Sequence, residues 1–326
     1  TLLTDLSCSY NQLSSLNLSQ NVSLINLQCE NNQLSGLNLA QNRSLNQLDC
    51  FNNLLTSLDL TNLQNLNWVN CNNNPSLTEI NIKNGVLSNS YYGLSFSNCP
   101  NLIYVCADDF NLNYFQQKVT NYNYINCNVG TYCSFVPGGN YYNIVGNVKY
   151  DYDSDGCNVV INDDFIYPNL SFTISDGTTN GTFITNNTGN YSIPLLAGNY
   201  TVTPNLENPT YFNINPTNFT VNFPTQASPF TQNFCVTRPG ISYPDDVEIM
   251  VLPLTPARPG FDVKYKILLR NKGADAEEGV INFTYNDAIM DYVSSMPIYN
   301  NSSSNVYSWN FSSLLPRVIF TFMPSA

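Results

Sequence analysis

A period of 21 residues governs the first 80 residues of the chain. Cys8, Cys29, Cys50 and Cys71 are spaced by 21 residues, and an asparagine follows each of them three positions later. A leucine or valine precedes each cysteine by two positions, and most units carry two further leucines. A fixed period of this length indicates a solenoid, in which each repeat forms one coil that stacks on the next.

The repeated unit reads L-x-x-L-x-C-x-x-N-x-L-x-x-L-x-L-x-x-N, which is a leucine-rich repeat with cysteine in place of one leucine. Side chains alternate along a strand, so we expect Leu6 and Cys8 to face the core and Ser7 and Ser9 to face solvent. Coils stacked about 4.8 Å apart form a parallel sheet. The asparagines should lie at the turn after each strand, where their amides satisfy backbone groups of neighbouring coils.

The cysteine column admits two interpretations: a series of disulfides or metal ligands, or a series of buried thiols that act as small hydrophobic groups. Equivalent inward residues of adjacent coils have nearly parallel Cβ vectors, which suit a disulfide badly. We therefore expect free, buried thiols in this column.

The repeat pattern fades after Leu77, and a short helix is predicted for residues 111–119 within a cap that closes the core. Four further cysteines fall in this region, and clustered cysteines in a small cap favour one or two disulfides and an oxidising compartment. The sequence does not fix their pairing, and Cys106–Cys127 is the pair that we favour.

The fold class predicted for the whole chain is mainly β: a leucine-rich repeat solenoid with a C-terminal cap, followed by two Ig-like β-sandwiches. Short alternating runs punctuated by Gly, Pro, Asn and Asp indicate the sandwiches. The predicted domains are residues 1–134, 140–237 and 243–326, and we expect the last one to be incomplete at residue 326. A disulfide between Cys157 and Cys235 should tie the first loop of the middle domain to its last strand.

Composition excludes several functions. The chain has no histidine, which removes Ser-His-Asp and Cys-His catalysis and histidine-containing zinc sites. The formal charge is −12 and the 11 basic residues are scattered, so nucleic acid and anionic membrane surfaces are poor partners. Adjacent acids on a strand point to opposite faces and do not form a glycosidase pair. We expect no enzymatic activity. No apolar run is long enough for a transmembrane segment and no signal peptide is present, so we expect any targeting segments to lie outside this sequence.

An acidic turn at residues 151–156 (DYDSDG) offers alternate carboxylates and a glycine that permits a tight bend, which suits Ca²⁺. The position at which an EF-hand carries glutamate is Asn162, so the turn is not an EF-hand. A solvated acidic turn is the alternative. The candidate ligands of a structural calcium ion are Asp151, Asp153, Asp155, Asp163 and Asp164.

An intramolecular isopeptide bond is a second hypothesis for the middle domain. Such a bond needs a lysine, an asparagine and a buried acid. Lys149 on the first strand, Asn233 on the last and Glu207 are the residues that would form it.

Three segments resemble known surface proteins. The cysteine-bearing repeats are similar to those of internalin-type bacterial surface proteins. The middle module resembles the B-type domains of serine-aspartate repeat proteins and collagen adhesins, through residues 146–151 (GNVKYD), 189–193 (GNYSI) and 197–202 (AGNYTV). The last module resembles a recurrent Ig-like repeat of bacterial surface proteins, through residues 259–267 (PGFDVKYKI) and 270–273 (RNKG).

The whole order, with residues 114–118 (YFQQK) and 223–230 (FPTQASPF), resembles the large secreted leucine-rich repeat proteins of flavobacteria. This resemblance implies a signal peptide, a type IX secretion signal and export to the exterior of the outer membrane. It implies no particular ligand.

Leucine-rich repeats usually bind on their concave sheet, and strand alternation predicts which side chains line it. Exposed aromatic side chains are favoured anchors in protein contacts and can stack on sugars; scattered surface aromatics are the alternative. The candidate binding residues are Glu30, Asp49, Phe51, Trp68, Asn70, Asn72, Tyr104 and Asp108. The tyrosine-rich segment at residues 90–93 is a second candidate surface.

The leading functional expectation is a cell-surface recognition protein or adhesin that binds protein or glycan through this sheet, with the sandwiches as a stalk. The alternative is an accessory or structural subunit of an outer-membrane protein complex.

Overall fold

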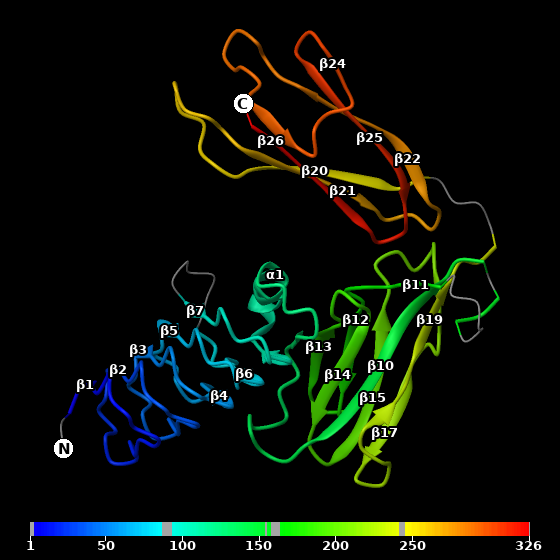
Figure 1. The fold of residues 1–326 in the computed structure, drawn as a ribbon. Coiled ribbons are helices and arrows are strands. Elements are labelled where there is room, and N and C mark those ends of the chain that lie inside the picture. The colour runs from blue at the N-terminus through cyan, green and yellow to red at the C-terminus, as the bar shows by residue number, and fades with distance from the viewer. Residues whose placement is uncertain (1–2, 87–92, 154, 158–163, 241–244, 326) are drawn as a thin grey trace. The chain divides into compact units, whose positions relative to one another are not determined.

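The computed structural model describes residues 3–86, 93–153, 155–157, 164–240 and 245–325 (Figure 1). The described chain is mainly β-structure, with one α-helix and one short 3₁₀ helix. It divides into two compact units. The first unit comprises Thr1–Leu206 and Ile214–Val236, and the second comprises Glu207–Asn213 and Thr237–Ala326.

Five parallel strands, one from each successive coil, form the first sheet of the first unit (Figure 1). The predicted register is confirmed for four of them, because Leu6 lies opposite Leu27, Leu27 opposite Leu48, and Leu48 opposite Val69. The strands are β1 (Asp5–Ser7), β2 (Asn26–Gln28), β3 (Gln47–Asp49), β5 (Trp68–Asn70) and β7 (Leu94–Ser95). The 21-residue period thus sets the pairing of the coils directly.

The asparagine column satisfies backbone groups of adjacent coils, as expected. The Nδ2 of Asn53 donates to the carbonyl oxygens of Cys29 (3.0 Å) and Cys50 (3.2 Å), and its Oδ1 accepts from the backbone N–H of Leu34 (3.0 Å). Asn32 and Asn74 repeat these bonds one coil away on either side. A buried turn is stable here because its polar backbone groups all find partners.

The cysteine column consists of free thiols, which confirms the prediction. Cys29, Cys50 and Cys71 are buried and Cys8 is half-buried. Burial raises the pKa of the Cys50 thiol well above its ordinary value, so this thiol stays protonated and inert. The column therefore contributes packing rather than reactivity.

The fifth coil departs from the period by four residues, since Asn70 pairs with Ser95. Phe96 consequently takes the place of the column cysteine. Cys99 takes the place of the asparagine, with its Sγ 3.5 Å from the carbonyl oxygen of Cys71. The insertion between residues 82 and 94 thus shifts the phase of the pattern without breaking the sheet.

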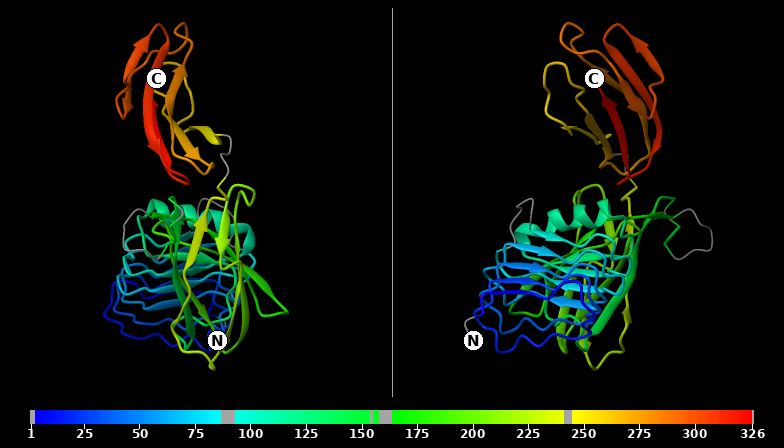
Figure 2. Two further views of the ribbon diagram at one scale, coloured as in Figure 1. Left: turned by 90° about the vertical axis from the view of Figure 1, so that its right-hand side faces the viewer. Right: turned by 60° about the vertical axis from the view of Figure 1, so that its left-hand side comes forward.

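A helix covers this end of the repeat core. It is α1 (Leu112–Asn121), preceded by the 3₁₀ turn η1 (Asp109–Asn111), and its ribbon lies along the coils (Figure 2, right). The helix buries Phe115 and Val119 against the core. The helix predicted for residues 111–119 is confirmed.

The second sheet begins on the other side of the same coils. Four parallel strands of the coils are followed in it by four antiparallel strands of the middle module, joined where Ile184 pairs with Val129. In sheet order they are β17 (Phe219–Phe223), β15 (Gly198–Asn205), β12 (Ser171–Ser175), β13 (Asn180–Ile184), β9 (Asn128–Gly130), β8 (Tyr104–Cys106), β6 (Glu79–Asn81) and β4 (Ser57–Asp59). The expected boundary between residues 134 and 140 therefore does not separate compact units, because one sheet runs through it.

A further sheet packs on the aromatic core of the middle module, where Phe172 lies 5.0 Å from Phe234 and 5.1 Å from Tyr191 between ring centroids. Its long central strand is β10, which pairs with β14 and β19 among others. The strands are β10 (Tyr142–Asp151), β11 (Phe165–Ile166), β14 (Asn190–Leu195), β16 (Asn213–Asn215), β18 (Phe230–Thr231) and β19 (Phe234–Thr237).

The second unit contains two sheets around a core that includes Trp309, Ile267 and Phe322. The indole N–H of Trp309 donates to the carbonyl oxygen of Pro297 (2.9 Å). One sheet contains β20 (Val247–Pro253), β21 (Tyr265–Asn271), β26 (Ile319–Ser325) and β23 (Ser294–Met296), and the other contains β22 (Glu277–Thr284), β25 (Val306–Leu314) and β24 (Asn301–Ser303).

Two disulfides lie in the first unit, Cys106–Cys133 and Cys157–Cys235. The second confirms the prediction, whereas the expected Cys106–Cys127 pair is wrong. Cys127 points into the repeat core together with Val129. Cys106 follows Val105, which also faces that core, so its side chain turns to the opposite face of the strand.

Candidate binding face

The outward face of the first sheet carries six of the eight predicted binding residues. Outward side chains of β1, β2, β3 and β5 are exposed or half-buried, whereas the inward Leu27, Leu48 and Val69 are buried. We call this surface the open face and define it by residues 5–9, 26–30, 47–51, 68–72 and 93–97. The six residues placed on it, all half-buried, are Glu30, Asp49, Phe51, Trp68, Asn70 and Asn72.

Tyr104 and Asp108 do not belong to the open face, so this part of the prediction is wrong. Tyr104 lies on β8 of the second sheet, is 2% exposed, and stacks on Phe183 at 6.1 Å. Asp108 is buried, and its carboxylate accepts from the backbone N–H of Gly85 (2.9 Å). The phase shift at the fifth coil explains the error, because Leu94–Ser95 takes the fifth place in the first sheet.

Two carboxylates on neighbouring coils face each other diagonally across the open face. Burial and the charge of Glu30 raise the pKa of Asp49 to about 6, against the lowering effect of hydrogen bonds from the Phe51 backbone and the Asn70 amide. Glu30 Oε2 and Asp49 Oδ1 have almost no exposure to solvent, and neither has a hydrogen-bond partner among the described residues. Ser9 Oγ, on the coil before Glu30, is in the same situation.

Amide side chains organise the far end of the open face. Asn72 Oδ1 accepts from the hydroxyl of Ser95 (2.8 Å) and the backbone N–H of Ser97 (2.6 Å). Asn70 Oδ1 accepts from the backbone N–H of Asn72 (3.3 Å). Sequence analysis missed Ser95 because the strand that carries it breaks the 21-residue period. The second predicted surface, at residues 90–93, lies outside the described residues except for Gly93.

Phe51 and Trp68 border Asp49 on two sides. Phe51 follows Asp49 by two positions on the same coil, and Trp68 lies on the next strand, opposite Gln47. Both are half-buried, so each keeps part of its ring open to a ligand. Aromatic rings beside carboxylates can hold sugars, apolar groups or cations.

The acidic turn brings three of its five predicted calcium ligands together. Asp151, Asp153 and Asp155 each offer an oxygen within 4.8 Å of the others. This separation fits ligands that surround one Ca²⁺ at 2.3–2.6 Å. The backbone N–H groups of Asp155 (3.2 Å) and Gly156 (3.1 Å) donate to Asp151 and fold the turn.

Asp164 lies at the base of this turn, and Asp163 lies outside the described residues. Tyr150 pairs with Phe165, so Asp164 stands across from Asp151 at the next position of the antiparallel pair. Its side chain is 3% exposed, and Oδ2 lies 3.2 Å from Lys149 Nζ. Its Oδ1 is buried without a hydrogen-bond partner among the described residues. Asp164 is nevertheless not part of the group of carboxylates that converge within 4.8 Å.

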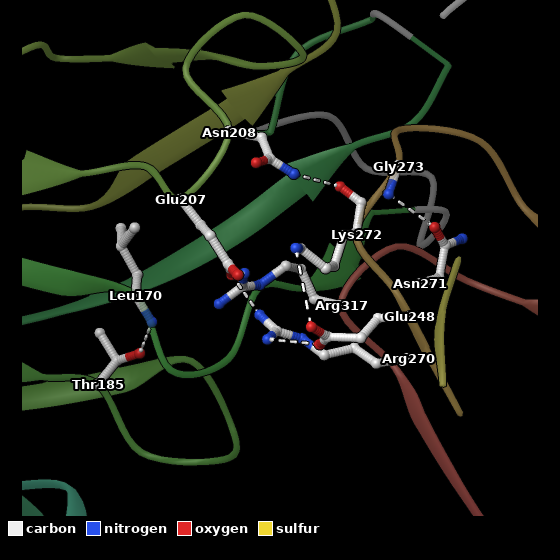
Figure 3. A network of polar contacts seen from close by, with 10 residues as sticks. All are labelled: Leu170, Thr185, Glu207, Asn208, Glu248, Arg270, Asn271, Lys272, Gly273 and Arg317. Carbon is white, nitrogen blue, oxygen red and sulfur yellow. Dashed lines mark hydrogen bonds and ion pairs between the residues drawn. The ribbon is translucent and has the colours of Figure 1, made fainter. Parts of the chain in front are cut away.

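Two of the three residues of the isopeptide hypothesis, Lys149 and Asn233, line the same hollow of the first unit. Lys149 pairs with Asp164, and Asn233 Oδ1 accepts from the backbone N–H of Asn147 (3.0 Å). Glu207 belongs to the second unit, where its carboxylate accepts from Arg270 and Arg317 (Figure 3). The Glu207 side chain is 36% exposed, so it is not the buried acid that such a bond needs, and this part of the isopeptide prediction is wrong.

The chain matches no protein-family model and no curated protein. Among solved structures, it is similar to the functional domain of InlJ from Listeria monocytogenes, which includes a cysteine ladder, at 18% identity and a TM-score of 0.24. That match covers 72% of this chain and 62% of the InlJ chain, so the chain spans less than two thirds of it. A DUF3823 family protein from Parabacteroides merdae matches at 15% identity and a TM-score of 0.23, covering 56% of this chain and 79% of that one. Neither score supports an argument about function.

No described helix has the length and apolar character needed to cross a membrane.

Proposed function

We propose that this chain is a non-enzymatic recognition protein of the bacterial cell surface, an adhesin whose leucine-rich repeat solenoid binds protein or glycan on the open face. In this proposal the Ig-like sandwiches support the solenoid. One observation carries it: the coils leave one sheet with half-buried aromatics and carboxylates outward, while strands β6, β8 and β9 of their other sheet are buried throughout and β4 keeps its outward side chains half-buried. Partly exposed aromatic side chains beside polar groups are favoured anchors for a partner.

The location outside the cell rests on the two disulfides, which form and persist in oxidising compartments. Export by type IX secretion to the exterior of the outer membrane is part of the same proposal. Immunolabelling of intact cells tests it, since an antibody raised against this chain should label cells without permeabilisation. Labelling that appears only after permeabilisation would refute surface exposure.

The binding face is tested by capturing the protein from gently solubilised native cells and identifying what accompanies it. The double variant Phe51→Ala/Trp68→Ala should lose the accompanying molecule. A matched control, Val22→Ala/Leu54→Ala, removes two exposed apolar side chains outside the open face and should retain it. Retention by both variants would refute the open face as the site.

The same capture separates the adhesin from the alternative, an accessory subunit of an outer-membrane complex. A stoichiometric outer-membrane partner lost in Phe51→Ala/Trp68→Ala would establish the subunit. Arrays of glycans and foreign surface proteins then test the adhesin, which should bind them through the same two aromatic residues.

We also propose that the turn at residues 151–156 holds a structural Ca²⁺, with Asp151, Asp153, Asp155 and Asp164 as ligands and Asp163 as a further candidate. The buried oxygen of Asp164 and the convergence of the other three carboxylates support it. Calcium should raise the melting temperature and release heat in calorimetry. Asp153→Asn/Asp155→Asn should abolish both responses, and magnesium should not reproduce them. A wild-type chain that shows neither response has no such site.

A further inference from the structure

The open face carries negative charge that the chain itself does not compensate. None of its five segments contains lysine or arginine, whereas Asp5, Glu30 and Asp49 lie on it. Lys118 on α1 is engaged at the far end of the first sheet, where it donates to the carbonyl oxygen of Leu94 and lies over the rings of Phe96 (5.5 Å) and Tyr114 (5.3 Å). A partner that contacts this face must therefore bring the positive charge.

The three acids differ in how their oxygens are used. Asp5 has both oxygens occupied, since Oδ1 accepts from the Asn26 amide (2.5 Å) and Oδ2 from the Thr4 hydroxyl (2.8 Å). Glu30 and Asp49 each keep one oxygen without a donor among the described residues. An acceptor without a donor, shielded from water, costs free energy that a ligand donor would recover.

The orphan oxygens can turn toward a ligand by rotation of the carboxylates, because the terminal torsion of a carboxylate is broad. For Asp49 this rotation exchanges the hydrogen bonds from the Phe51 backbone and the Asn70 amide for bonds from the ligand. Ser9 Oγ, likewise unpartnered, lies on the coil next to Glu30 and can accept a further donor. Ser9 lies opposite Glu30 and Asp49 lies diagonally from it, so the three side chains form a row of acceptors across three coils.

The geometry points to an arginine side chain of a protein partner as the group that binds between Glu30 and Asp49. This inference rests on the proposed function of the open face and names its ligand chemistry. A guanidinium offers five donors in a planar fork, which suits two carboxylates and a hydroxyl better than a single ammonium does. Its plane can also stack on Phe51 or Trp68 while its edge meets the carboxylates.

A metal ion fits this place less well than a guanidinium. Calcium takes six to eight oxygen ligands, whereas this place supplies only the carboxylates of Glu30 and Asp49 and the hydroxyl of Ser9. Within the described residues, the group of three or more acids suited to a metal is the turn at Asp151, Asp153 and Asp155 instead. An extended organic cation can satisfy the row of acceptors where a small ion cannot.

The test uses the full chain and three synthetic peptides immobilised at equal density. Each peptide carries the same residue at three positions that are separated by glycine and serine. This residue is arginine in the first peptide, lysine in the second peptide and citrulline in the third peptide. Citrulline keeps the planar shape of arginine and removes its charge. We expect retention in the order arginine, lysine, citrulline, with at least a tenfold difference between the first and the last.

Glu30→Gln and Asp49→Asn should each weaken retention on the arginine peptide about tenfold. Asp5→Asn is the matched control, because it removes the same charge from the same face, but at a carboxylate whose two oxygens already accept hydrogen bonds. Its effect on retention should stay within twofold. Thermal unfolding of each variant confirms that the fold is intact.

Equal retention on arginine and citrulline peptides would overturn the inference, as would equal effects of Asp5→Asn and Asp49→Asn. Retention on lysine equal to that on arginine would overturn the assignment of a guanidinium. These failures are distinct from failure of the proposed function. If Phe51→Ala/Trp68→Ala loses its captured partner while Glu30→Gln and Asp49→Asn keep it, the open face binds and its ligand is not cationic.

Discussion

The two sheets built by the same coils differ in what covers them. On the first sheet, outward residues of β2, β3 and β5 are exposed or half-buried. On the second sheet, every residue of β6, β8 and β9 is buried. The repeat therefore makes two surfaces from one pattern, and the middle module continues only the second.

Two glutamates show what this difference means for polar groups. Glu79 on the second sheet is 3% exposed, and its Oε2 accepts from the backbone N–H of Gly138 (2.9 Å). Glu30 on the first sheet keeps its Oε2 without a partner among the described residues. Buried polar groups that serve the fold are satisfied within the fold. The unsatisfied acid is on the sheet that remains available to a partner.

The largest expected effect comes from exchanging an aromatic side chain on each sheet for alanine. Tyr104→Ala removes a buried ring that contacts Phe135 (5.4 Å) and Phe183 (6.1 Å), and should lower the free energy of unfolding by about 3–5 kcal/mol. Trp68→Ala removes a half-buried ring from the open face and should cost about 1 kcal/mol. Urea unfolding measures both.

Loss of partner binding should rank these two variants in the opposite order to loss of stability. Trp68→Ala should lose the partner, and Tyr104→Ala should keep it under conditions where the variant is folded. A Trp68→Ala variant as unstable as Tyr104→Ala would show that the first sheet is covered too, and the contrast between the sheets would fail.

Removal of the Cys106–Cys133 disulfide should have a second, smaller effect on stability, this time on the second sheet. The disulfide closes a loop with a sequence separation of 27 residues, so Cys106→Ala/Cys133→Ala should lower the free energy of unfolding by about 3 kcal/mol. Paired substitution is preferable to reduction, because a reductant would also open Cys157–Cys235. Retention of the open-face partner should not change, and a loss of binding would show that the two sides are coupled.

The open face could be predicted from the sequence as far as the period holds. Strand alternation and the 21-residue spacing place Glu30, Asp49, Phe51 and Trp68 correctly, because the register of stacked coils is a local property of the repeat. The same logic predicts the buried thiols and the asparagine bonds. Each of these features depends only on a coil and its neighbours.

The errors arise where distant segments decide the structure. The sequence of residues 101–107 (NLIYVCA) matches a repeat strand and so predicts Tyr104 on the first sheet, but β7 (Leu94–Ser95) takes the fifth place instead. The second sheet continues into the middle module through pairing of Ile184 with Val129, which no periodicity reveals. The disulfide error has a different cause, since Cys127 faces the repeat core and Cys106 faces away from it, toward Cys133.

The smallest expected effect is on the pH dependence of stability, through the protonation of Asp49 and Asp5 on the open face. The change in stability with pH has opposite signs for these two acids. The pKa of Asp49 is raised to about 6, chiefly by burial and then by Glu30, above about 3.9 in the unfolded chain. Its contribution to stability is therefore fully present below about pH 4 and is lost as the pH rises through 6. Asp49→Asn should gain stability relative to wild type across this window and keep the gain at pH 7.

Asp5 provides the comparison, because hydrogen bonds from Asn26 and Thr4 lower its pKa. Its contribution is present above the unfolded value and is lost as the pH falls through the folded one, so Asp5→Asn should lose stability at pH 7 and recover it in acid. Thermal melts of both variants from pH 3 to 8 measure the difference. Parallel pH profiles would mean that Asp49 is as well satisfied by hydrogen bonds as Asp5, and the carboxylate of Asp49 would then gain nothing from a cationic partner.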